Sequence, residues 1–143
     1  SAAINMVITS TGAGNAVTKV IPSLAGKLTA NAVRVPTPNV SLAILKLSLN
    51  RTTSIEDLNA TMRDAALRGN LVNQINYQVD PELVSTDIIG NSCCSVYDSN
   101  ATIVTDEGKD VVLYVWYDNE FGYTKQVIRL SKLIAKVRRL TYY

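Results

Sequence analysis

Residues able to bind an anion occur near the start of the chain. Thr11 and Gly12 lie where an apolar run, residues 4–8, gives way to a helical pattern. A helix N-terminus presents free N–H groups and a partial positive charge, and a glycine there lets a phosphate approach the backbone. The alternative is that Ser10 or Thr11 only caps the helix, since hydroxyl residues are preferred at that position.

A second candidate for anion binding is Arg34, which interrupts the apolar stretch from Ala32 to Pro36. A guanidinium in a half-buried strand needs an anionic partner, and a carboxylate or phosphate offers the best bidentate match. A buried salt bridge or a solvent-facing position on the strand would explain the arginine equally well.

The third candidate is the stretch VWYDNEFGY, residues 115–123, where an apolar run breaks into Asp118, Asn119 and Glu120. Asn119 can both donate and accept hydrogen bonds, and the end of a strand delivers such a side chain to the rim of a sheet. Asp118 and Asn119 are also typical of a turn or of an N-cap for the last helix.

Other reactive side chains favour structural roles. Cys93 and Cys94 are adjacent, which suits neither a disulfide between them nor a metal site, and no neighbouring feature would activate a thiol. We interpret them as reduced thiols of a cytosolic protein. The chain has no histidine and begins at Ser1, so we expect a fragment of a longer protein that supplies any imidazole base.

Composition predicts one domain over residues 1–143, with a core of its own. A net charge of +2 from 14 basic and 12 acidic residues argues against general nucleic-acid binding. We interpret a basic cluster near the C-terminus as a solvated helix end: Lys132, Lys136, Arg138 and Arg139. No apolar stretch reaches the roughly 20 residues that span a bilayer, so we expect no membrane partner.

The hydrophobic pattern predicts strands and helices joined by short connections. Strands are expected at residues 4–8, 28–35, 40–49, 83–88, 94–97, 101–104 and 111–117. Helices are expected from Ala13 to Ile21, after a capping box formed by Thr53 and Glu56, and from Glu120 onward. The order favours an α+β fold with a mixed, largely antiparallel sheet and helices packed on one face. A glycine-rich dinucleotide fingerprint is absent, so any Rossmann domain would lie outside this chain.

Three motifs in this order resemble phosphorylating glyceraldehyde-3-phosphate dehydrogenase: residues 10–13 (STGA), 34–41 (RVPTPNVS) and 116–123 (WYDNEFGY). Shorter matches occur at residues 26–29, 84–87 and 97–99, and the resemblance extends from Ala3 to about Leu130. It implies most of the catalytic, substrate-binding domain of that family, without its NAD-binding domain.

The resemblance also implies a role for each candidate residue. Thr11 and Gly12 would bind the inorganic phosphate that attacks the acyl-enzyme, and Arg34 would hold the phosphate of the sugar substrate. Asn119 would position the nicotinamide carboxamide of NAD, and Tyr123 would pack nearby. The family's nucleophilic cysteine, its base histidine and its second phosphate-binding arginine all precede this segment. We therefore expect no catalytic residue, no metal ligand and no dehydrogenase activity in the fragment alone.

The family further implies glyceraldehyde 3-phosphate as substrate, a cytoplasmic location and a homotetramer. Gly14 and Asn15 stand where alanine and lysine are common, and the tail from Ile134 is longer than usual. Two alternatives stay open: an enzyme similar to erythrose-4-phosphate dehydrogenase, and a non-catalytic oligomerisation or interaction domain.

Overall fold

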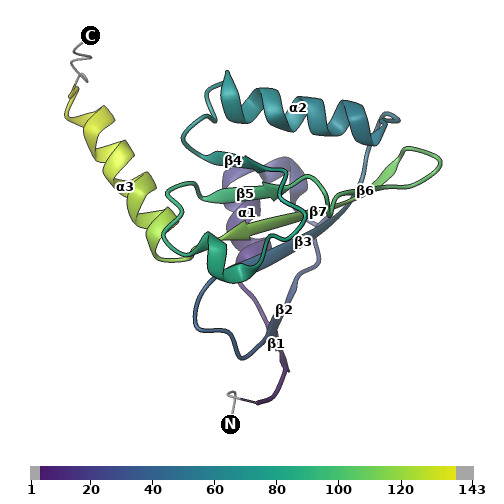
Figure 1. Ribbon diagram of the computed structural model, residues 1–143, viewed down its shortest axis with the longest axis horizontal. Helices are drawn as coiled ribbons and strands as arrows, with labels where there is room; N and C mark the ends of the chain where they lie inside the picture. The colour runs from purple at the N-terminus through teal and green to yellow at the C-terminus, as the bar shows by residue number, and fades with distance from the viewer. Residues whose placement is uncertain (1–3, 138–143) are drawn as a thin grey trace. The chain divides into compact units, whose positions relative to one another are not determined.

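The computed structural model describes residues 4–137, and the chain divides into two compact units, Ser1–Pro38 and Asn39–Tyr143 (Figure 1). The single domain expected over residues 1–143 stays a prediction. Arg138 and Arg139 of the predicted basic cluster lie outside the described residues. None of the helices between residues 4 and 137 has the length and apolarity that a membrane crossing requires.

The first unit is a two-stranded antiparallel sheet with a helical connection. β1 (Val7–Ser10) pairs with β2 (Asn31–Arg34), and α1 (Ala13–Val20) and a 3-10 turn, η1 (Pro22–Leu24), lie between them. The helix stops where predicted, because Pro22 has no N–H to continue the α-helical bonding. Both strands are shorter than their apolar runs: β1 begins three residues later than expected, and β2 spans only part of residues 28–35.

The second unit contains a five-stranded sheet. Its main path has the order β3 (Ser41–Ser48), β7 (Asp110–Tyr117), β5 (Ser95–Asp98) and β4 (Ile75–Gln78), and the short β6 (Ile103–Val104) also pairs with β7. Every pairing is antiparallel except that of β4 with β5. The predicted α+β class with a mixed, largely antiparallel sheet is confirmed.

The core of this unit lies between the sheet and α2 (Ile55–Leu67), which runs beside β4 (Figure 1). Tyr97, Val111 and Leu113 are buried there, and Leu58 and Met62 of α2 pack against them. The Tyr97 hydroxyl donates a 2.8 Å hydrogen bond to Asn59 Oδ1 of the same helix. One face of the sheet is therefore covered by α2. The last helix, α3 (Phe121–Ile134), begins just beyond β7 and leads away from the sheet (Figure 1).

In this unit one predicted strand was wrong and one strand was missed. Residues 83–88, expected as a strand, form a 3-10 turn, η2 (Ser85–Ile88), because the Asp87 carboxylate accepts a hydrogen bond from the Val84 N–H at 2.9 Å. Such a local bond competes with strand pairing. The strand β4 was not predicted at all.

The N-cap of α2 is Ser54, and not Thr53 as the predicted capping box required. Ser54 Oγ accepts a hydrogen bond from the Asp57 N–H at 3.1 Å, whereas the Thr53 hydroxyl donates to the Ser54 carbonyl at 3.2 Å. The first turn of the helix therefore begins one residue later than predicted, and the residue whose N–H donates to the capping side chain is Asp57 and not Glu56.

We therefore expect Ser54→Ala to lower the free energy of unfolding by about 1 kcal/mol, since a helix N–H loses its capping acceptor. Thr53→Val, which keeps the side-chain shape, should cost less than about 0.5 kcal/mol. Urea unfolding followed by the fluorescence of Trp116, the one tryptophan of the sequence, measures both. Equal losses for the two variants would contradict the assignment of Ser54 as the cap.

Candidate functional site

The N-terminus of α1 combines a local turn with open space. Thr11 Oγ1 accepts a hydrogen bond from the Ala13 N–H at 3.2 Å, but neither Ser10 nor Thr11 is the N-cap residue that the alternative required. Gly12 is the N-cap residue, and a side chain added to it would meet no atom within 4 Å. There is therefore open space on the side of Gly12 where a Cβ would project.

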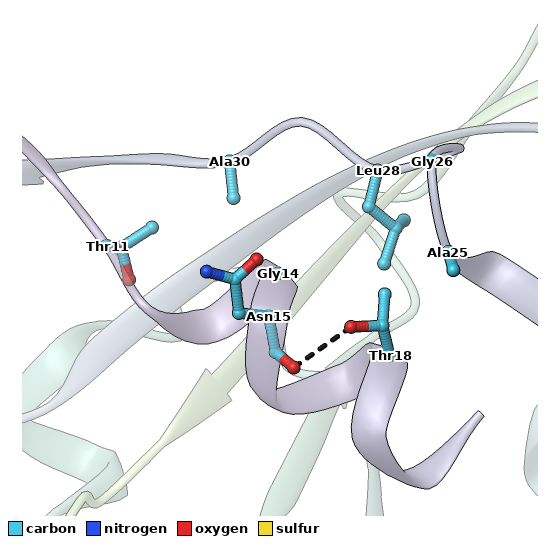
Figure 2. Close-up of a pocket in the computed structure, with 8 residues that line it drawn as sticks. All are labelled: Thr11, Gly14, Asn15, Thr18, Ala25, Gly26, Leu28 and Ala30. Atoms are coloured by element: carbon cyan, nitrogen blue, oxygen red, sulfur yellow. Dashed lines mark hydrogen bonds between the residues drawn. The ribbon is translucent and has the colours of Figure 1, made fainter. Parts of the chain in front are cut away.

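A cavity of about 210 Å³ lies against this end of the helix. It is lined by Thr11, Gly14, Asn15, Thr18, Ala25, Gly26, Leu28 and Ala30. Figure 2 shows the Asn15 amide between Thr11 and Ala30, while the Thr18 hydroxyl donates to the Asn15 carbonyl at 3.0 Å. A neutral amide thus lies beside Thr11 at the position where the resembled family commonly has a lysine.

Arg34 is the last residue of β2 and is exposed. Within residues 4–137 the guanidinium forms no ion pair. The structure therefore has the solvent-facing position that the sequence left open, and not the half-buried position or the buried salt bridge. Its backbone lies opposite Val7, and Thr11 follows four residues beyond Val7 along the chain. At roughly 3.3 Å per residue, Arg34 and Thr11 are separated by about 13 Å along the strand. This separation accommodates two distinct phosphate groups.

Asn119 and Tyr123 belong to the second unit and are both exposed. Asn119 lies in the turn between β7 and α3, and Tyr123, in the first turn of α3, has 70% of its surface exposed. The exposed amide of Asn119 carries an NH₂ donor group and a carbonyl acceptor, which together complement another carboxamide. The structure thus brings Thr11, Gly12 and Arg34 together in one unit and Asn119 and Tyr123 in the other.

Asp118 is the buried polar residue whose importance the sequence did not reveal. It is only 3% exposed, and its carboxylate accepts hydrogen bonds from four donors. These are the N–H groups of Gly90 (2.9 Å), Glu120 (3.1 Å) and Phe121 (2.9 Å) and the amide of Asn39 (3.3 Å). The bonds from Gly90 and then Phe121 are the largest causes of a pKa of Asp118 below its usual value of 3.8. An aspartate three residues before a helix was the available signal. Asp118 Oδ1 accepts from the N–H groups at the start of α3, although the N-cap residue itself is Glu120.

Since the folded pKa of Asp118 lies below that of the unfolded chain, its ionised form stabilises the fold above pH 3.8, and this stability is lost as the pH falls through the folded pKa. We expect Asp118→Asn to lower the free energy of unfolding at pH 7 by about 2 kcal/mol, because an amide nitrogen would face N–H donors.

The difference between wild type and Asp118→Asn should stay constant from pH 7 to about 5 and shrink below about pH 4, because unfolded aspartate titrates near 3.9. Urea unfolding at pH 7, 5 and 3.5 tests this. A difference that is the same at all three pH values would show that the charge of Asp118 contributes nothing.

The two cysteines show no sign of activation. Both are half-buried free thiols, and Cys94 Sγ donates to the Gln74 carbonyl at 3.4 Å. Burial, and next the neighbouring Cys94, raise the pKa of the Cys93 thiol, which lowers its thiolate fraction. Among residues 4–137 no three side chains of the types that bind metals lie close enough together to hold an ion.

Comparison with known proteins shows the family of this chain. Residues 1–119 match the family model described as glyceraldehyde 3-phosphate dehydrogenase, C-terminal domain. A glyceraldehyde-3-phosphate dehydrogenase-like protein of Pseudomonas aeruginosa is 52% identical over 96% of this chain and 29% of its own length. Glyceraldehyde-3-phosphate dehydrogenase 1 of Bacillus subtilis is 46% identical over 95% of this chain and 40% of its own length.

A third relative, glyceraldehyde-3-phosphate dehydrogenase 2 of Drosophila melanogaster, is 47% identical over 92% of this chain and 39% of its own length. The chain therefore spans well under half the length of these relatives. The three helices of residues 4–137 and the mixed, largely antiparallel pairing define an α+β protein, which is the class that the sequence predicted. The chain belongs to the glyceraldehyde-3-phosphate dehydrogenase family, and it corresponds to the C-terminal domain.

Proposed function

We propose that this chain supplies the substrate-binding domain of a phosphorylating, NAD-dependent glyceraldehyde-3-phosphate dehydrogenase. The enzyme would oxidise the aldehyde and release it as an acyl phosphate. The observation that carries the proposal is Arg34, an exposed guanidinium that forms no ion pair within the described residues. An arginine in this state is available for a phosphate on a substrate.

Each site residue has one task in this reaction. Arg34 binds the phosphate of glyceraldehyde 3-phosphate, and the N-terminus of α1 at Thr11 and Gly12 binds inorganic phosphate. Asn119 hydrogen-bonds the nicotinamide carboxamide, and Tyr123 packs beside it. NAD, when bound, accepts the hydride. The residues of this chain therefore orient the reactants and stabilise charge, which are the positional and electrostatic parts of catalysis.

The thiol nucleophile and the imidazole base belong to the part of the complete protein that would precede residue 1, together with the NAD-binding domain. This chain contains no histidine, and its Cys93 is a poor nucleophile because the pKa of its thiol is raised. The acylation chemistry consequently depends on groups from outside the chain.

We also propose that the complete protein is a cytoplasmic homotetramer. Leu42 and Ile44 on β3 are 37% and 59% exposed. Alternation along the strand puts them on the opposite face from Leu47, which packs into the core beside α2. An uncovered apolar sheet face of this kind suits another subunit. Ile44→Asp is expected to reduce the mass of the complete protein found by sedimentation, because a charge at this face would separate the subunits. An unchanged mass would show that this face is not part of the subunit interface.

The proposal is tested by sequencing the gene upstream of the Ser1 codon and assaying the protein that it encodes. We expect a glycine-rich dinucleotide fingerprint, a cysteine and a histidine upstream. The complete protein should form NADH from glyceraldehyde 3-phosphate, and the 143-residue chain alone should form none. A start codon immediately before Ser1, or a complete protein inactive with this aldehyde, would overturn the proposal.

A further inference from the structure

The Asp118 carboxylate joins three segments of the second unit. Oδ2 accepts from the Gly90 N–H, which follows η2, and from the Asn39 amide, which precedes β3. Oδ1 accepts from the N–H groups of Glu120 and Phe121 at the start of α3. The three segments thus share one buried acceptor at the end of β7.

Only a carboxylate satisfies this arrangement. All four partners are donors, two for each oxygen, so both atoms of the side chain must accept. An asparagine would turn its NH₂ group toward one of these pairs, and that pair would lose its acceptor. The site therefore distinguishes aspartate from its nearest isostere.

Asn119 lies inside the loop that these bonds close. Its backbone is fixed on one side by Asp118 at the end of β7 and on the other by the bonds from Glu120 and Phe121 to the same carboxylate. Its own side chain is exposed. The bonds to Asp118 therefore hold the backbone from which the Asn119 side chain projects.

The Asn39 end of the network is held at the cost of backbone strain. Asn39 Oδ1 accepts from the Val40 N–H at 2.7 Å while its amide donates to Asp118. Val40 has a φ of 77°, a conformation that is rare for a β-branched residue. Strain of this kind persists only where surrounding contacts impose it, and it is concentrated at functional sites.

A cavity of about 330 Å³ adjoins the same carboxylate. Its lining residues come from the three joined segments: Asn39, Ile89, Gly90, Asp118, Glu120, Phe121 and Thr124. The network therefore borders open space beside the turn that carries Asn119, where a bound group can reach that turn.

We propose that Asp118, held by Asn39 and Gly90, is a positioning residue that orients Asn119 toward the nicotinamide carboxamide of NAD. The inference rests on the proposed function, since it assigns Asn119 to the cofactor. Asp118 itself does not touch the cofactor and acts through its neighbour.

The test compares NAD with ADP-ribose, which lacks the nicotinamide, by titration calorimetry on the complete protein. Asn119→Ala should weaken NAD binding about three- to tenfold, the value of one hydrogen bond, and leave ADP-ribose binding unchanged. Asp118→Asn should produce the same selective loss. The double variant should bind NAD no more weakly than Asn119→Ala, because both changes remove the same contact.

The outcomes separate this inference from the proposed function. If Asn119→Ala leaves NAD binding unchanged, the cofactor role of Asn119 fails. Suppose that Asn119→Ala behaves as expected. The positioning role of Asp118 is then overturned if Asp118→Asn weakens the binding of NAD and ADP-ribose equally or changes neither affinity. It is also overturned if the double variant binds NAD more weakly than Asn119→Ala alone.

A milder variant covers the case in which Asp118→Asn does not fold. Asn39→Ala removes one of the four bonds to the carboxylate and should show a smaller loss that is again selective for NAD. If Asn39→Ala weakened the binding of NAD and ADP-ribose equally, or changed neither affinity, the positioning role of Asp118 would be overturned. Asp64→Asn makes the same chemical change on the exposed face of α2, where Asp64 pairs with Arg68 at 3.7 Å, and should alter neither affinity.

Discussion

Arg34→Ala in the complete protein is expected to lower kcat/KM for glyceraldehyde 3-phosphate by about 100- to 10,000-fold. The guanidinium is exposed and forms no ion pair within residues 4–137, so its donors are available to the substrate. A hydrogen bond to a charged group contributes about 1.5–3 kcal/mol, and a bidentate pair with phosphate contributes two of them. Steady-state NADH formation measures the loss.

Three comparisons isolate the phosphate contact. The kcat/KM for glyceraldehyde without a phosphate should be unchanged by Arg34→Ala. Arg34→Lys should be more active than Arg34→Ala because it keeps the positive charge, and less active than wild type because lysine cannot form the bidentate hydrogen bonds of a guanidinium. Arg51→Ala removes another exposed arginine and should have no effect. An equal fall for both aldehydes would mean that Arg34 acts on the fold or on another step.

Gly108→Ala should destabilise the second unit by about 3 kcal/mol. Gly108 is buried with a φ of +68°, and a Cβ there would lie 2.6 Å from the Thr53 carbonyl oxygen. The left-handed conformation costs an alanine about 1–2 kcal/mol. The clash also displaces the Thr53 N–H from the Gly108 carbonyl, which it contacts at 2.8 Å, at a further cost of about 1 kcal/mol.

Gly90→Ala is the matched control for this prediction. Gly90 has a φ of +79°, but an added Cβ would meet no atom within 4 Å. That variant should lose only the conformational term of about 1–2 kcal/mol. Urea unfolding monitored by Trp116 fluorescence compares the two. Equal destabilisation would mean that the contact with Thr53 adds no cost.

The helices were the most predictable part of the fold, because their signals are local. Amphipathic spacing and Pro22 located α1, and the apolar positions after Thr53 located α2. The parallel pairing of β4 with β5, which brings Ile75 opposite Ser95, depends on residues distant in sequence. The residues around Ile75 do not indicate that β5 is their pairing partner, and β4 was therefore not predicted.

The sequence could indicate a candidate site residue only where the proposed role depends on that side chain and not on partners from distant parts of the chain. The roles proposed for Arg34 and Asn119 follow from residue type and from their place at a strand end, and they stay predictions; the structure adds that both residues are exposed. Asp118 differs, because its environment is assembled from Gly90 and Asn39, which lie 28 and 79 residues away along the chain. Its local sequence indicates only a turn or a cap. The hydrogen bonds from Gly90 and Asn39 to Asp118 can be identified only from the folded structure, which brings these donors to the carboxylate.

The central claim, a phosphorylating dehydrogenase, is tested most directly by the stoichiometry of the reaction. The complete protein is supplied with glyceraldehyde 3-phosphate and NAD, the concentration of inorganic phosphate is varied, and NADH and acyl phosphate are both quantified. We predict that the steady-state rate saturates with phosphate and that one acyl phosphate forms for each NADH. Steady NADH formation that is independent of phosphate and yields the free carboxylate would contradict the claim.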